Sequence, residues 1–140
     1  MAITGGCLCG TVRFAIEAEA PLFARQCWCR VCQYIGAGSG TVNAFFKKDA
    51  VRVSGGTTDF VCRADSGSTI HRSFCAQCGT HLFAEAEERP EFIVVRVGTL
   101  DDPNLAKPGA IIWTKSAPAW AYFHPALPQT EGQPSGPPKT

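Results

Sequence analysis

The sequence has no excess of charge of either sign and no long apolar run. Lysine and arginine number 13 and aspartate and glutamate number 12, so the net charge is +1, and basic residues form no cluster. This balance provides no field that would attract nucleic acid or an anionic membrane surface. No apolar stretch reaches the length of a membrane span, and the first residues lack the basic and apolar regions of a secretory signal. We therefore expect a cytoplasmic protein that binds neither nucleic acid nor membrane.

The composition favours short strands and turns over long helices, because glycine (14) and proline (10) are frequent and charged residues make only 18% of the chain. Apolar residues that alternate or run together between turn-forming residues predict strands at 12–16, 41–46, 51–54, 60–63, 70–74, 81–86, 92–97 and 111–113. A single helical turn is expected from Val31, ended by the glycines that follow. The sequence therefore predicts a mainly β protein.

The length of 140 residues is that of one domain. From Pro125 onwards proline, glycine, glutamine and serine are frequent, which predicts a loose C-terminal tail. We therefore expect one domain over 1–124 and a tail over 125–140. Four aromatic residues near the end of this domain are candidates for the wall of a pocket, although such residues more often form core: Trp113, Trp120, Tyr122 and Phe123.

The chain contains eight cysteines, which is many for its length. In a reducing compartment such cysteines bind metal more often than they pair, and a disulfide scaffold would need an export signal. Thiolate sulfur is a soft ligand that suits zinc. Seven of the eight fall in three clusters: Cys7 and Cys9; Cys27, Cys29 and Cys32; Cys75 and Cys78.

The first and last clusters together supply four thiols. Cys7 and Cys9 lie among glycines at the entrance to a predicted strand, where a sharp turn lets both sulfurs approach one ion. Cys75 and Cys78 form a Cys-x-x-Cys knuckle far downstream. Four cysteines in this spacing are typical of structural zinc, and the wide separation in sequence makes metal binding part of folding. We call these four residues the quartet.

The middle cluster, Cys27, Cys29 and Cys32, offers one ligand fewer than a closed tetrahedron needs; we call it the trio. Structural zinc sites are filled by four protein ligands, whereas sites that do chemistry keep a position open. The trio therefore predicts an open zinc site, unless a fourth side chain closes it and the metal is structural. A third alternative is that the trio is empty or oxidised in isolated protein, because open thiolate clusters lose metal and form disulfides more readily than closed ones.

Four further residues are candidates to close the trio: Cys62, His71, His81 and His124. A lone histidine is more often a packed or surface side chain than a ligand. Cys62 lies in a predicted strand, where a single cysteine behaves as a small apolar residue. We include none of the four among the expected ligands.

The motifs that carry the cysteines match a known family. They are Gly5-Gly-Cys7-x-Cys9-Gly-x-Val-Arg13-Phe, Cys27-x-Cys29-x-x-Cys32, Arg72-x-Phe-Cys75-x-x-Cys78-Gly-Thr-x-Leu82 and Gly98-Thr-Leu-Asp-Asp-Pro103. This pattern, from Gly5 to about Trp120, resembles the glutathione-dependent formaldehyde-activating enzyme family, which includes the centromere protein V type proteins. The resemblance implies a fold of several small coiled antiparallel sheets organised around zinc, with two zinc ions per chain, one on the quartet and one on the trio.

The resemblance also implies a carbon–sulfur lyase. In the family's namesake, the zinc that corresponds to the trio is where the sulfur of glutathione meets formaldehyde to give S-hydroxymethylglutathione. The surroundings of the trio depart from the family, because Gln33 and Tyr34 stand where two basic residues are usual, and Trp28 and Ile111 where histidine is usual. Two cations that could hold the carboxylates of glutathione are therefore lost.

We therefore expect a zinc-dependent carbon–sulfur lyase-type enzyme that acts on adducts of a small thiol, such as glutathione, with a small aldehyde. Cys27, Cys29 and Cys32 would be its catalytic residues, and Arg30 is the nearest candidate in sequence to hold negative charge on the bound thiol or adduct. The alternative is a non-enzymatic zinc-binding module with a protein-interaction role. The fourth ligand of the trio distinguishes the two.

Overall fold

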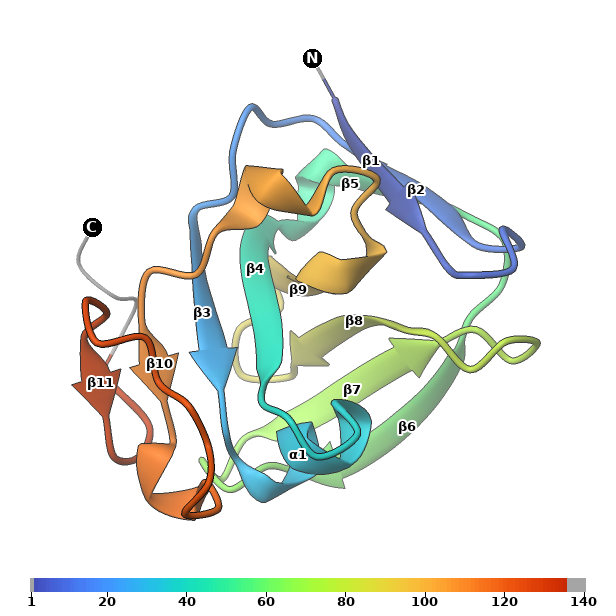
Figure 1. Cartoon of the computed structure of the whole chain (residues 1–140). Helices are drawn as coiled ribbons and strands as arrows, with labels where there is room; N and C mark the ends of the chain where they lie inside the picture. The colour runs from blue at the N-terminus through green and yellow to red at the C-terminus, as the bar shows by residue number, and fades with distance from the viewer. Residues whose placement is uncertain (1, 136–140) are drawn as a thin grey trace.

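The computed structural model of the protein describes residues 2–135, whose strands form two sheets (Figure 1). The smaller sheet is antiparallel and consists, in spatial order, of β1 (Ile3–Gly6), β2 (Arg13–Ile16) and β5 (Val51–Ser54). The larger sheet consists, in spatial order, of β11 (Gln129–Thr130), β10 (Ile111–Ile112), β3 (Phe23–Cys27), β4 (Thr41–Lys47), β9 (Phe92–Arg96), β8 (His81–Ala86), β7 (Thr69–Phe74) and β6 (Thr58–Arg63). The prediction of a mainly β fold with more than one sheet is confirmed.

Helices are short in the described part of the chain. α1 (Arg30–Ile35) follows β3 and ends at Gly36, as the glycines after Val31 predict. The 3-10 helices are η1 (Lys48–Ala50), η2 (Val97–Thr99), η3 (Pro103–Ala106) and η4 (Thr114–Ser116). Across residues 2–135, no helix has the length and apolar character needed to cross a membrane.

The two faces of the larger sheet have different roles, because side chains along a strand alternate between its faces. On one face, residues of β4 and β9 pack against β2 of the smaller sheet in the main core: Ala44, Phe46, Ile93, Val95, Phe14 and Ile16. The other face carries the alternate residues of the same strands, among them Asn43 and Arg96. The core thus lies between the two sheets, and the opposite face of the larger sheet is left for a site.

The strands β1, β3 and β11 were not predicted. β3 contains Arg25 and Gln26, and β1 contains Gly5 and Gly6, so neither has the apolar alternation of an obvious strand. Strand β10, in contrast, was expected, and it pairs in parallel with both β3 and β11.

The structure also differs from the prediction of a loose tail over 125–140. β11 pairs with β10, the backbone N–H of Ile111 donates to the carbonyl of Pro128 (2.9 Å), and Trp113 Nε1 donates to Gln133 Oε1 (2.9 Å). Proline removes a backbone donor but keeps its carbonyl, so a proline-rich segment can still accept hydrogen bonds from a neighbouring strand. Residues 136–140 of the expected tail lie outside the described residues.

Candidate metal centres

The quartet is assembled by two loops from different sheets. The loop between β1 and β2 carries Cys7 and Cys9, and the loop between β7 and β8 carries Cys75 and Cys78. Their sulfur atoms all lie within 4.8 Å of one another; Cys7 Sγ and Cys9 Sγ are 3.6 Å apart, and Cys9 Sγ and Cys75 Sγ are 3.8 Å apart. The structure therefore brings together the four thiols that the spacing groups.

Backbone amides point at the quartet's sulfurs. Val12 N donates to Cys7 Sγ (3.2 Å), and Cys78 N donates to Cys75 Sγ (3.5 Å). The hydrogen bond from Val12 lowers the pKa of Cys7, and hydrogen bonds from the side chain and backbone of Thr80 lower the pKa of Cys78 to about 5. Such donors stabilise thiolate, which is the form that binds metal. Four such sulfurs are the donor set of a closed structural zinc site.

The trio lies where β3 passes into α1. Cys27 is the last residue of β3, Cys29 caps the N-terminus of α1, and Cys32 lies in its first turn. The three sulfurs lie within 4.8 Å of one another, all three residues are buried, and Cys32 N donates to Cys29 Sγ (3.4 Å). The turn from β3 into α1 thus brings the three sulfur atoms close together.

The thiols of the trio alter one another's pKa values. Hydrogen bonds from Cys27 and Cys29, aided by the charge of Arg96, lower the pKa of Cys32 to about 2. Hydrogen bonding to Cys29 and Cys32 raises the pKa of Cys27 far above its ordinary value, because Cys27 serves as a proton donor to its neighbours. The cluster therefore holds one thiolate readily and gains from a cation that displaces the remaining protons.

No further histidine, cysteine or carboxylate of residues 2–135 joins the trio at ligand distance. Cys62 Sγ accepts a hydrogen bond from Arg72 Nη1 (2.9 Å), and His71 Nε2 pairs with Glu87 Oε1 (3.0 Å). The ring of His81 lies against Phe74, with centroids 5.2 Å apart. His124 Nδ1 accepts from the backbone of Ala126 (3.2 Å). The trio therefore offers three candidate ligand atoms, without a fourth from the described residues.

A pocket of about 220 Å³ opens beside the trio, and its wall includes Cys27, Cys29 and Cys32. Its floor is the free face of the larger sheet. Two rows of paired residues form this floor: Phe23, Phe45, Val94, Ala84 and Arg72 across β3, β4, β9, β8 and β7, and Arg25, Asn43 and Arg96 across β3, β4 and β9. All three cysteines of the trio therefore border this cavity.

Only one of the four aromatic candidates lines this pocket. Trp113 lies in its wall, whereas Trp120 and Tyr122 are exposed. Phe123 packs edge-on against Trp28, with ring centroids 5.9 Å apart. The expectation of a pocket wall therefore holds for Trp113.

Arg30 does not lie where the sequence places it. Its guanidinium donates to Gln33 Oε1 (2.5 Å) and stacks over the ring of Tyr34 at 5.2 Å, outside the residues that line the pocket. The reason is local: the first turn of α1 brings residues three and four apart onto one face of the helix. Arg30 therefore contacts residues of its own helix and does not line the pocket, and its role in holding charge at the trio stays a prediction.

Sequence reasoning missed Arg25, Arg72 and Arg96, which come from three strands of the larger sheet and line the pocket. One signal was available in β3, where Phe23, Arg25 and Cys27 alternate and therefore share a face. For Arg72 and Arg96 the sequence has no such link to the trio, because their neighbours in the sheet are distant in sequence.

Comparison with known proteins agrees with the motifs. Residues 2–116 match the family described as glutathione-dependent formaldehyde-activating enzyme. A curated protein of Halomonas elongata that is named for the same enzyme is 26% identical over 125 residues, which are 86% of this chain and 80% of that protein. The crystal structure of a Rhodobacter sphaeroides protein shares the fold, with a TM-score of 0.57 and 24% identity over 75% of this chain and 96% of that one. The chain belongs to the glutathione-dependent formaldehyde-activating enzyme family.

Proposed function

We propose that the protein is a zinc-dependent carbon–sulfur lyase-type enzyme that acts on the adduct of a small thiol with a small aldehyde. The family name supplies glutathione and formaldehyde as an example, and their adduct is S-hydroxymethylglutathione. The observation that carries the proposal is the trio itself: three buried thiols, without a fourth ligand from residues 2–135, in the wall of a pocket. A structural zinc site is closed by four protein ligands and needs no open position, whereas a catalytic site keeps one for water or substrate.

The donor sets fit zinc. Cys7, Cys9, Cys75 and Cys78 would hold one ion as a structural site, and Cys27, Cys29 and Cys32 would hold a second and act as the catalytic cysteines. When bound there, zinc would lower the pKa of a substrate thiol that takes the open position.

The reaction balances without an oxidant or reductant. In the lyase direction the C–S bond of RS–CH₂–OH breaks and its electron pair stays on sulfur, while the hydroxyl loses its proton and the C=O bond of the aldehyde forms. The proton ends on the thiol product. In the other direction a thiolate adds to the carbonyl carbon. Holding the two partners in the reacting geometry would supply the rate enhancement, in a pocket whose wall includes the stacked rings of Phe23 and Phe45. We assign this chemistry to the cytoplasm, where small thiols stay reduced.

The test combines zinc content with turnover of a panel of thiol and aldehyde pairs. Wild type is expected to hold two zinc ions per chain and to turn over at least one pair. Cys29→Ser is expected to hold one ion and to lose turnover, whereas Cys62→Ser, which alters a cysteine outside both clusters, keeps two. Full turnover by Cys29→Ser would refute the proposal. Two bound ions without turnover of any pair would favour the non-enzymatic zinc-binding module.

A further inference from the structure

Three arginines are buried on the floor of the pocket beside the trio. The exposed fractions of Arg25, Arg72 and Arg96 are 7%, 4% and 8%. They stand on β3, β7 and β9, and the strand register places all three on the sheet face that lines the pocket. Arginine is rarely buried to this extent unless its charge is matched.

None of the three has a carboxylate partner among residues 2–135, whose ion pairs are Arg13–Asp101, Lys48–Glu85 and His71–Glu87. The two acidic residues that line the pocket, Glu85 and Asp65, form no ion pair with these arginines. Glu85 Oε2 pairs with Lys48 (2.6 Å), and Asp65 is exposed and accepts from the backbone N–H of Arg30 (3.4 Å).

Neutral groups satisfy the arginines only in part. Arg96 Nη1 donates to Asn43 Oδ1 (2.5 Å), and Arg72 Nη1 donates to Cys62 Sγ (2.9 Å). Arg25 lies over the ring of Phe45, 4.9 Å from its centroid. The Nε atoms of Arg72 and Arg96 are buried without a partner in the described chain. Buried donors in this state are costly unless a ligand completes them.

The trio matches only part of this charge. Three thiolates with one divalent zinc ion have a net charge of one negative. The pocket lining also holds four guanidiniums, those of Arg25, Arg72, Arg96 and the exposed Arg89, and one carboxylate without a cationic partner, that of Asp65, because Glu85 is paired with Lys48. The pocket therefore keeps an excess of positive charge next to the position where the proposed function puts a thiol. Guanidinium groups bind carboxylates through paired hydrogen bonds, which makes a carboxylate the natural counter-ion.

We infer that the substrate thiol of this pocket bears a carboxylate, and that the positive charge of Arg25, Arg72 and Arg96 on the pocket floor attracts this carboxylate and so determines substrate specificity. This inference rests on the proposed function, since it names the class of thiol that the trio would take. A cavity of about 220 Å³ is below the range of about 300–1,000 Å³ typical of drug-sized ligands. It suits a thiol whose carboxylate lies a few atoms from its sulfur. The arginines would also replace the two cations that are absent after Cys32.

The test compares four ligands of similar size by calorimetry on the zinc-loaded full chain: 3-mercaptopropionate, 3-mercaptopropionamide, propionate and propionamide. 3-Mercaptopropionate is expected to bind about tenfold tighter than its amide, or more, because the amide lacks the charge that guanidinium recognises. This preference should fall several-fold in Arg72→Met and in Arg96→Met. Arg25→Met is a third variant, since its side chain covers aromatic rings and its replacement leaves no buried donor unpaired. Arg52→Met, an exposed change on β5 of the smaller sheet, is the matched control and should keep the full preference.

The binding results distinguish a failure of the arginine assignment from a failure of the proposed thiol chemistry. If wild type binds 3-mercaptopropionate and its amide equally, with both tighter than the compounds without sulfur, the arginine assignment is wrong and the proposed thiol chemistry stands. If carboxylates bind through the arginines but sulfur adds nothing to affinity, the proposed function fails. The arginines then still bind a carboxylate, but the ligand need not be a thiol. A preference that survives in all three variants overturns the inference.

Discussion

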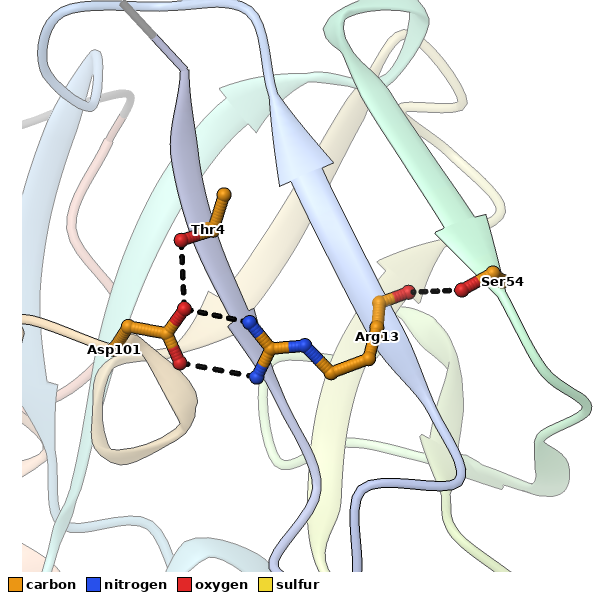
Figure 2. A network of polar contacts seen from close by, with 4 residues as sticks. All are labelled: Thr4, Arg13, Ser54 and Asp101. Atoms are coloured by element: carbon orange, nitrogen blue, oxygen red, sulfur yellow. Dashed lines mark hydrogen bonds and ion pairs between the residues drawn. The ribbon is translucent and has the colours of Figure 1, made fainter.

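Arg13 binds both carboxylate oxygens of Asp101, at 3.0 Å for Nη1 to Oδ1 and 2.6 Å for Nη2 to Oδ2, although 88 residues separate the two (Figure 2). Thr4 Oγ1 also donates to Asp101 Oδ2 (2.6 Å). These contacts tie β1 and β2 of the smaller sheet to the turn after η2. Arg13, and secondarily Thr4, lowers the pKa of Asp101 to about 2. Asp101 therefore connects distant parts of the chain.

The ion pair predicts a pH dependence of stability. The pKa of Asp101 is depressed from 3.8 in the unfolded chain to about 2 in the fold, so its stabilisation is fully present above pH 3.8 and is lost as pH falls through about 2. Asp101→Asn should unfold at lower urea concentration than wild type at pH 7. The difference should shrink as pH approaches 2, and it should be modest because both side chains are about half exposed. Urea midpoints that differ equally at every pH would contradict this account.

The two cysteine clusters should differ in their effect on stability. The quartet joins loops far apart in sequence, so losing its metal frees long segments of chain, whereas the trio spans only Cys27 to Cys32. Cys75→Ser is therefore expected to lower the melting temperature much more than Cys29→Ser, each losing one zinc ion per chain. Circular dichroism melts and metal analysis of the same samples measure both quantities. Equal losses of melting temperature would show that the quartet is not the structural site.

Gly5 should not tolerate a side chain. A Cβ at Gly5 would lie 2.3 Å from the carbonyl oxygen of Thr99 and 2.4 Å from the ring of Phe14, where β1 meets Leu100 in an isolated bridge. Gly5→Ala is expected to reduce the free energy of unfolding by about 1–3 kcal/mol, because backbone and core must shift. Gly56→Ala is the matched control, since a Cβ there meets nothing within 4 Å. Urea unfolding of both variants gives the comparison, and equal effects would refute it.

Gln33 should hold the loops around the trio together. Its buried Nε2 donates to the carbonyls of Trp28 (2.8 Å) and Ser116 (2.9 Å), which joins the residue between Cys27 and Cys29 to η4. Gln33→Glu should cost about 1–3 kcal/mol of stability, because a carboxylate places acceptors against two carbonyls. A variant of its exposed neighbour, Tyr34→Phe, should change stability little. If Gln33→Glu unfolds at the same urea concentration as wild type, these hydrogen bonds are not structural.

Much of the candidate site is readable from sequence because the cysteine motifs are local. A Cys-x-Cys pair beside glycines and a Cys-x-x-Cys knuckle each fix how two or three sulfurs lie within one loop, whatever the rest of the chain does. The structure accordingly brings together the quartet and the trio as grouped from their spacing. Strands whose apolar residues alternate or run together between turns, such as β4 and β8, were predicted because that pattern is also local.

Arg30 and Arg96 show that closeness in sequence to the trio does not predict which residues line the pocket. Arg30 is one residue from Cys29 but lies outside the pocket, whereas Arg96 is 64 positions from Cys32 and lines it. An arginine in a strand has the same local pattern whether it faces solvent or a cavity, and only the pairing of β3, β4 and β9 settles which. By itself the sequence determined which thiols gather and that the protein is mainly β. The tertiary structure alone decided which charges surround the trio, because sheet pairing brings together residues that have no local relationship.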